Sequence, residues 1–194
     1  MNKQVILVTG TPCVGKTTLA KGLTEELNGE YVNLTELAES QGLILEKDQQ
    51  RDTLVIDDAK MRRRLKKLIE KSSNTSVIID GHYAAAVTPK MLVTNVFVLR
   101  RNPEQLREFM IKRGYNQQKQ SENLSAEILD VCLMEALQKQ DKEKICELDC
   151  SDKTLAELLS QVKAVIEGKQ QCSVGAVDWL GMLEFKGKTD QYLK

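Results

Sequence analysis

The amino-acid sequence predicts an α/β fold in which five parallel strands form a sheet that helices cover on both faces. Short apolar runs alternate along the chain with longer segments whose apolar residues recur every three or four positions, and this alternation is typical of strand–helix–strand units. Two of the runs, at 76–80 and 93–100, are almost continuously apolar, as expected for parallel strands that are buried on both faces.

The individual elements follow from apolar spacing and from the residues that begin or end helices. In the first half we expect a strand at 5–8, a helix to about Leu27, a strand at 31–33, a helix from Thr35 to about Gly42, an irregular polar stretch at 46–52, an apolar stretch at 53–56 and a helix from Asp57 to about Lys71. In the second half we expect strands at 76–80 and 93–100, a helix at 103–113, an irregular break at 114–120, a long helix at 125–139, a strand at 145–148 and a helix at 154–167.

The composition fits a single domain. The chain has 194 residues, enough to bury a sizeable core. Its 28 basic and 28 acidic residues give no net charge, so no overall basic field favours nucleic acid or an anionic membrane. No apolar run approaches the ~20 residues that span a bilayer, and the first residues enter a strand rather than a signal peptide. We therefore expect a soluble, cytoplasmic protein without membrane contacts.

The five cysteines show no CxxC pair and no zinc spacing, and any pairing leaves one over. We interpret Cys132, Cys146 and Cys150 as small apolar residues in a reducing compartment.

Residues 10–18, GTPCVGKTT, match GxxxxGK[ST] between a strand and a helix, the context that makes this pattern a P-loop. Gly10 and Gly15 let the backbone curl so that its N–H groups point at a polyphosphate, and the start of the helix adds the positive end of its dipole. Lys16 is expected to reach the β- and γ-phosphates, and the Thr17 hydroxyl to ligate the bridging Mg²⁺. The motif predicts a site for a nucleoside triphosphate but does not identify the acceptor.

A second set of polar residues follows the strand at 76–80. Asp80 ends this strand, where α/β sheets bind their ligands, and it has the position of a Walker B carboxylate that holds Mg²⁺. The alternative is a turn or capping aspartate. His82, the only histidine, lies two residues further on and is predicted to orient a water molecule or to hydrogen-bond a phosphate, although lone histidines are often structural.

Three segments together resemble one family: the P-loop at 10–18, Asp80-Gly81-His82 after an apolar strand, and the strand at 96–100 followed by Arg113-Gly114-Tyr115-Asn116. From about residue 4 to 167 the chain resembles the atypical adenylate kinases that also act in assembly of the small ribosomal subunit. These include the nuclear adenylate kinase, also described as the coilin-interacting nuclear ATPase, and archaeal relatives.

The resemblance implies one P-loop kinase domain at 1–167, with an adenylate kinase-like sheet, a nucleoside-monophosphate-binding segment at about 33–56 and a short lid at about 112–122. The tail at 168–194 either docks on this body or binds a partner. The implied catalytic residues are Lys16, Asp80, His82 and Arg113, and the implied metal ligands are Thr17 and Asp80. The implied ATP contacts are Gly10, Cys13, Val14, Gly15, Lys16, Thr17, Thr18, Arg113 and Lys153.

An acceptor monophosphate calls for an arginine, whose planar fork binds phosphate through two hydrogen bonds. Arg51 is our first candidate and Arg100 the second; for each the alternative is a solvated charge. The chain departs from the family at Cys13, where relatives usually have glycine, so a positive φ there would mean strain. It also departs at Phe109, where relatives tend to carry arginine, so that Arg107, Arg113 or Lys119 would have to supply the charge.

The function that the resemblance implies is transfer of the γ-phosphate of ATP to AMP, with ATPase activity and a role in maturation of small-subunit rRNA. The implied partners are a small-subunit ribosomal protein and pre-ribosomal RNA. The basic face of the helix at 57–71 is either solvated or a contact for such a partner. One alternative is an ATP-driven ribosome-assembly switch with little kinase turnover, and another is a kinase for a non-nucleotide acceptor.

Overall fold

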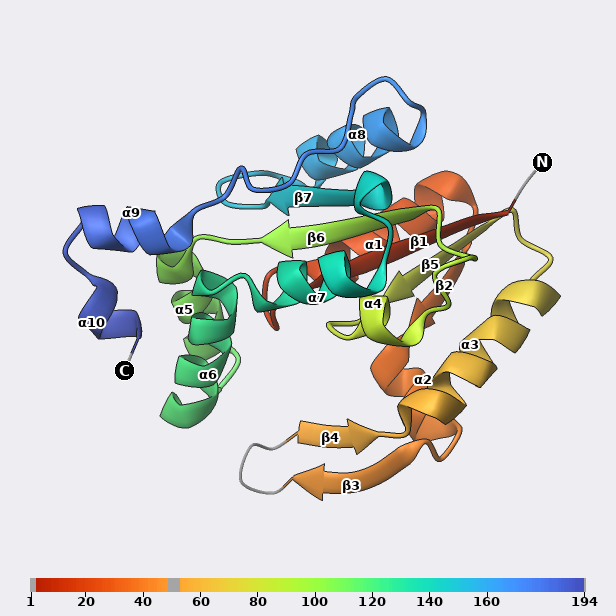
Figure 1. Cartoon of the computed structure of the whole chain (residues 1–194), viewed down its shortest axis with the longest axis horizontal. Coiled ribbons are helices and arrows are strands. Elements are labelled where there is room, and N and C mark those ends of the chain that lie inside the picture. The colour runs from red at the N-terminus through yellow and green to blue at the C-terminus, as the bar shows by residue number, and fades with distance from the viewer. Residues whose placement is uncertain (1–2, 49–52, 194) are drawn as a thin grey trace.

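The computed structural model describes residues 3–48 and 53–193, and at its centre lies a five-stranded sheet (Figure 1). The strands, in spatial order, are β2 (Glu30–Asn33), β5 (Ser76–Asp80), β1 (Gln4–Gly10), β6 (Asn95–Arg100) and β7 (Ile145–Asp149). Every pair of neighbours in this sheet is parallel. The predicted parallel sheet of five strands is therefore confirmed.

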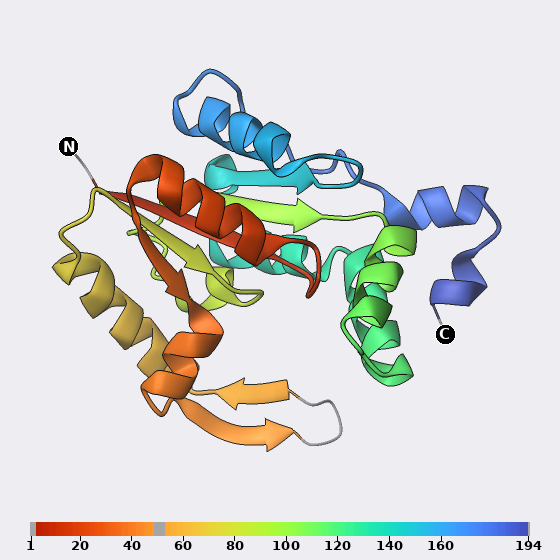
Figure 2. The same ribbon diagram turned by 180° about the vertical axis from the view of Figure 1, so that it is seen from behind.

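Helices cover both faces of the sheet. On one face lie α1 (Lys16–Leu27) and α8 (Leu155–Ile166), and on the other lie α3 (Asp58–Lys71), α4 (Ala84–Val87) and α7 (Val131–Lys139). Figure 1 shows α4 and α7 in front of the sheet. Figure 2, the view from the opposite side, shows α1 in front of it. Alternate residues of β1 divide between the two cores, with Ile6 and Val8 on the α1 side and Val5 and Leu7 on the other, as the two-residue period of a strand requires.

The carboxyl ends of the five strands face a second group of elements. These are α5 (Pro103–Lys112), α6 (Gln117–Ile128), α9 (Trp179–Phe185) and α10 (Thr189–Tyr192) (Figures 1 and 2). Apart from this group, α2 (Leu34–Ser40) leads into an antiparallel hairpin of β3 (Ile44–Asp48) and β4 (Thr53–Ile56). Figure 1 shows that this hairpin projects from the body below the sheet. A short 3₁₀ helix, Lys142–Lys144, precedes β7. The P-loop thus lies between two projecting units.

The predicted long helix at 125–139 is wrong, because it is two helices. α6 ends at Ile128, Asp130 takes a left-handed backbone conformation with φ of 58°, and α7 begins at Val131. α6 also begins earlier than expected, at Gln117, where the Asn116 side chain accepts a hydrogen bond from the backbone N–H of Lys119 at 2.8 Å. The first turns of α6 are polar and exposed, so the apolar spacing that marks a helix is missing there.

The segment after α8 packs on the body. The side chains of Trp179, Leu183 and Tyr192 are buried in the core that also contains α1 and α6. Cys146 of β7 is joined by a disulfide to Cys172, which corrects the expectation that Cys146 is a free small apolar residue. The sequence did not indicate this pair, because Cys172 lies in a tail without periodicity that returns along β7. In the described parts of the chain, no helix has both the length and the apolar character needed to cross a membrane.

Candidate active site

The P-loop turns sharply between β1 and α1 because two of its glycines adopt backbone angles that side chains disfavour. Gly10 has φ of 134° and Gly15 has φ of 113°. A Cβ atom at Gly10 would collide with the carbonyl oxygen of Leu99 on the neighbouring strand. The loop can therefore curl closely around a ligand, with the first turn of α1 directed at it.

Cys13 occupies a strained position in the same loop. Its φ is 71°, in the left-handed region that costs an L-residue with a Cβ about 1–2 kcal/mol. The side chain is buried, and its Sγ lies 3.9 Å from Nη1 of Arg113. Because this position demands a positive φ, the cysteine is not a neutral replacement for glycine.

The ammonium group of Lys16 is held by the loop itself. Its Nζ donates a hydrogen bond of 2.9 Å to the carbonyl oxygen of Thr11. The protein packed around the ammonium lowers the pKa of Lys16, whereas the negative charges of Asp80 and Glu127 act in the opposite direction. The lysine is thus oriented by a neutral acceptor, which leaves its charge available for phosphate.

Asp80 collects hydrogen bonds at the carboxyl end of β5. Its Oδ2 accepts from the hydroxyls of Thr17 at 2.7 Å and Tyr31 at 2.8 Å, and from Nδ2 of Asn33 at 3.3 Å. Burial raises the pKa of Tyr31 to about 12, so its phenol stays protonated as a donor. Sequence analysis missed Tyr31 and Asn33; the signal that could have found them is their position on the short strand that pairs with the strand of Asp80.

The set of a threonine hydroxyl and a carboxylate fits Mg²⁺, which prefers oxygen ligands and keeps several waters and phosphate oxygens of its substrate. The structure brings the Thr17 hydroxyl and the Asp80 carboxylate within hydrogen-bond distance of each other. Two side chains that bind the same metal ion must lie close together in this way.

His82 lies at the rim of the same site. Its carbonyl oxygen accepts a hydrogen bond of 2.8 Å from the Thr9 hydroxyl, which fixes the backbone of the turn. The protein atoms around the imidazole, and then the positive charge of Lys16, lower the pKa of His82 to about 4, although the residue is partly exposed to solvent. The ring is therefore neutral at pH 7 and can offer a hydrogen bond but not a charge.

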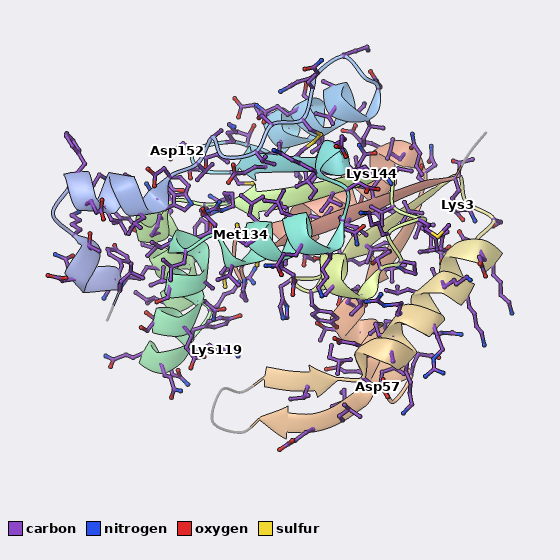
Figure 3. All side chains as sticks on the ribbon, viewed as in Figure 1. Lys3, Asp57, Lys119, Met134, Lys144 and Asp152 are labelled. Atoms are coloured by element: carbon purple, nitrogen blue, oxygen red, sulfur yellow. A yellow bond between two sulfur atoms is a disulfide. The ribbon has the colours of Figure 1, made fainter. Side chains whose placement is uncertain are left out.

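Two cavities meet at the P-loop. The smaller, of about 360 Å³, lies between α1, α5 and α8; the larger, of about 390 Å³, extends towards α2, β4 and α6. The smaller is lined by Cys13, Val14, Gly15, Thr18, Leu19, Leu99, Arg101, Phe109, Lys112, Arg113, Lys153, Leu155 and Leu158. The larger is lined by Lys16, Thr17, Asp80 and His82, and by residues of the neighbouring elements. Lys119, which Figure 3 labels on α6, is one of these, as are Leu54 and Ile56 of β4.

Arg113 and three P-loop residues, Cys13, Gly15 and Thr18, line both cavities. Arg113 is exposed at the end of α5, and Lys153 lies in the smaller cavity with its Nζ 3.5 Å from Oε1 of Gln161. The arrangement can therefore hold two ligands, one in each cavity, with one set of phosphate-binding groups between them.

The positive charge near Phe109 comes from Arg113, one of the three predicted suppliers, which lines the same cavity, and from Arg101 and Lys112, which the sequence analysis did not name. The guanidinium carbon of Arg101 lies 5.1 Å from the centre of the Phe109 ring, and Nζ of Lys112 lies 5.8 Å from it. Nε of Arg101 also donates to the Val14 carbonyl at 3.1 Å. Arg107, one of the predicted suppliers, instead lies over Tyr192. The signal that could have found Arg101 is its position directly after β6.

Arg100 was predicted as a second contact for the acceptor, and the structure contradicts this. Its side chain is buried and turned inward, where it pairs with Glu127 at 3.0 Å, Glu147 at 2.5 Å and Asp130. Burial alone would lower the pKa of Arg100, but these carboxylates raise it. Four of the five N–H donors of this guanidinium are engaged inside the protein, and the buried side chain is turned away from a substrate. The first candidate, Arg51, lies outside the described residues.

Comparisons with known proteins agree with this geometry. The family described as an AAA domain (AAA_18) matches residues 6–130. A "Putative adenylate kinase" of Methanocaldococcus jannaschii is 37% identical over 174 residues, covering 90% of this chain and 92% of the relative. One of Methanococcus maripaludis is 35% identical over 181 residues, covering 91% and 95%. A crystal structure of shikimate kinase from Bacteroides thetaiotaomicron superposes with a TM-score of 0.54 at 18% identity, covering 84% of this chain and 98% of that one. This last likeness shows the P-loop kinase fold.

Proposed function

Because this chain belongs to the adenylate kinase-like family of P-loop proteins, we propose that it transfers the γ-phosphoryl group of ATP to AMP. The observation that carries the proposal is the pair of cavities that share Cys13, Gly15, Thr18 and Arg113. Transfer between two nucleotides needs two sites that meet at the transferred group, and a simple hydrolase needs one.

The smaller cavity suits the nucleoside of ATP. Phe109, Arg101 and the two leucines Leu155 and Leu158 provide flat and apolar walls for a base. The phosphates would then extend over the P-loop to Lys16. The larger cavity would take AMP, with Arg51 as the proposed contact for its phosphate.

Phosphoryl transfer depends mainly on positioning and on charge neutralisation. Lys16 and the P-loop N–H groups would bind the β- and γ-phosphates, and Arg113, which faces both cavities, would balance charge on the transferred group. Thr17 and Asp80 would hold Mg²⁺, which supplies further neutralisation of the phosphates when it is bound. His82, neutral at pH 7, would hydrogen-bond a phosphate oxygen or orient a water molecule; the latter would account for ATPase activity.

The proposal is tested by measuring ADP production from ATP and Mg²⁺ with and without AMP. We expect AMP to stimulate ADP production, and Lys16→Met to lower kcat/KM by about 10²–10³-fold, the usual cost of removing one preorganised charge or donor from a transition state. Lys142→Met, which changes an exposed lysine of the 3₁₀ helix, is the matched control and should leave the rate unchanged. Slow turnover that ignores AMP and other monophosphates would contradict the kinase.

That outcome would favour the second function that we propose, an ATP-driven switch in assembly of the small ribosomal subunit. The feature that favours it is the exposed basic face of α3, which contains Arg62, Arg63, Arg64, Lys66 and Lys67. Such a face suits RNA or an acidic protein surface. Charge reversal at Arg63 and Lys67 should then weaken capture of small-subunit components while ATP turnover stays the same.

A further inference from the structure

Glu127, near the end of α6, is a buried carboxylate at which three distant parts of the chain meet. Its Oε2 accepts a hydrogen bond of 2.6 Å from the hydroxyl of Thr11 in the P-loop. Its Oε1 accepts from the backbone N–H of Arg101 at 3.0 Å and from Nε1 of Trp179 at 3.1 Å. The same oxygen also pairs with Nε of Arg100. The side chain of Glu127 is 1% exposed, so solvent cannot replace these partners.

Thr11 connects Glu127 to the phosphate-binding lysine. Thr11 is itself 1% exposed, and its carbonyl oxygen is the acceptor for Nζ of Lys16 at 2.9 Å. Two hydrogen bonds that share one residue therefore lie between the Glu127 carboxylate and the ammonium group. If the Thr11 side chain loses its anchor, its carbonyl keeps the hydrogen bond of 3.4 Å from the backbone N–H of Val14 but loses the support of Glu127, so the position of Lys16 is less firmly fixed.

Charge supports the same connection. Three carboxylates, those of Glu127, Asp130 and Glu147, surround the single guanidinium of Arg100. The cluster therefore has an excess of negative charge behind the P-loop, and Glu127 is its member that touches the loop. A fixed negative charge at this point attracts the Lys16 ammonium into place while the phosphate site is empty.

We propose that Glu127 is a positioning residue for nucleotide binding, which holds Thr11 so that Lys16 is preorganised for the phosphates. The inference rests on the proposed nucleotide-binding function, because Lys16 is the group that it positions. Trp179 of α9 donates to the same carboxylate, so the segment after α8 is part of this support. α6 directly follows the region of Arg113 and packs against α9, which puts Glu127 between the proposed lid and the tail.

Glu147 offers a matched control for Glu127. Its side chain is also fully buried, and it also pairs with Arg100, at 2.5 Å. Its other oxygen accepts from the backbone N–H groups of Gly175 and Ala176 at 2.8 and 3.0 Å. All of these partners lie outside the P-loop. Glu127→Gln and Glu147→Gln therefore remove the same charge from the same cluster, and only the first also changes a contact to the loop.

The experiment compares these two variants with the unmodified protein in two measurements. The first is amide hydrogen exchange of the backbone N–H groups of residues 11 and 13–16 without nucleotide, and the second is calorimetric binding of ATP with Mg²⁺. We expect both variants to unfold at lower temperature. Glu127→Gln should speed exchange in the P-loop and weaken ATP binding, each by about 10-fold, as for loss of a buried charged hydrogen bond. Glu147→Gln should leave both within about two-fold of the original values.

Unchanged exchange and affinity in Glu127→Gln, or equal losses in Glu147→Gln, would overturn the inference. If the unmodified protein fails to bind ATP, the proposed function fails, and the exchange measurement still decides the role of Glu127. If Glu127→Gln does not fold, Thr11→Val replaces it, because this variant removes only the hydroxyl that Glu127 holds. We expect Thr11→Val to have the same effect on exchange, and the double variant to be no worse than either single one.

Discussion

Two inward-facing cations, Lys16 and Arg100, lie close to the carboxyl edge of the sheet, and their surroundings differ. Arg100 is 1% exposed and is paired with three carboxylates. Lys16 donates to a neutral carbonyl oxygen of its own loop. A cation whose charge is already balanced stabilises the fold, whereas one that is held by a neutral group keeps its charge for a ligand. Arg100 ends a strand and Lys16 follows one in the sequence, so position along the chain alone does not separate the two roles.

The largest effect that we expect from this difference is on stability at Arg100. Arg100→Met leaves the carboxylates of Glu127 and Glu147 buried without their counter-charge. The free energy of unfolding should fall by about 3–5 kcal/mol, as when one partner is removed from a buried ion pair. Equilibrium denaturation in urea measures it. If the free energy of unfolding falls by less than about 1 kcal/mol, the ion pairs of Arg100 do not stabilise the fold in the way that we infer.

A smaller effect is expected at Cys13, where the P-loop itself carries strain. Cys13→Ala and Cys13→Gly both remove the thiol, but only glycine adopts φ of 71° without cost. The glycine variant should therefore be more stable than the alanine variant by about 1 kcal/mol. The comparison of the two denaturation curves isolates the backbone, because both variants lose the same contact to Arg113. Equal stabilities would show that the loop relaxes around the side chain.

The smallest change in stability is expected at Lys16. Lys16→Met has nearly the same length, and it removes an ammonium that is poorly solvated in the folded state and has a neutral partner. The free energy of unfolding should stay the same or rise by up to about 1 kcal/mol, since burying a charge is costly, although we expect kcat/KM to fall by about 10²–10³-fold. Equilibrium denaturation of Lys16→Met in urea measures this free energy of unfolding. A loss as large as that of Arg100→Met would remove the distinction between the two cations.

The sheet and the P-loop could be predicted from sequence because their signals are local. Continuous apolar runs mark the buried strands, and the spacing of Gly10, Gly15 and Lys16 alone defines the curled loop. The helix expected from Asp57 also begins there, because the Asp57 side chain accepts a hydrogen bond from the backbone N–H of Lys60 at 3.0 Å and so caps the first turn. Asp80 and Thr17 were expected near one another because strand ends and the P-loop share one edge of the sheet.

What could not be predicted depends on partners that are distant in sequence. Arg100 ends a buried strand as a ligand-binding residue would, and only the folded chain brings Glu127 and Glu147 to it. Arg101 was missed because its task depends on Phe109 of the next helix and on the Val14 carbonyl. The role that we propose for Glu127 has no motif, since its partners lie up to 116 residues away.

The tail that returns along β7 also covers an edge of the sheet. β7 is the outer strand of the sheet, and such a strand exposes backbone groups that can recruit a strand from another molecule. Here the N–H of Glu147 donates to the carbonyl of Ser173 at 2.9 Å, and the disulfide of Cys146 ties the same stretch alongside. The segment at 172–173 thus covers part of an edge strand that would otherwise be open to pairing with a strand of another molecule.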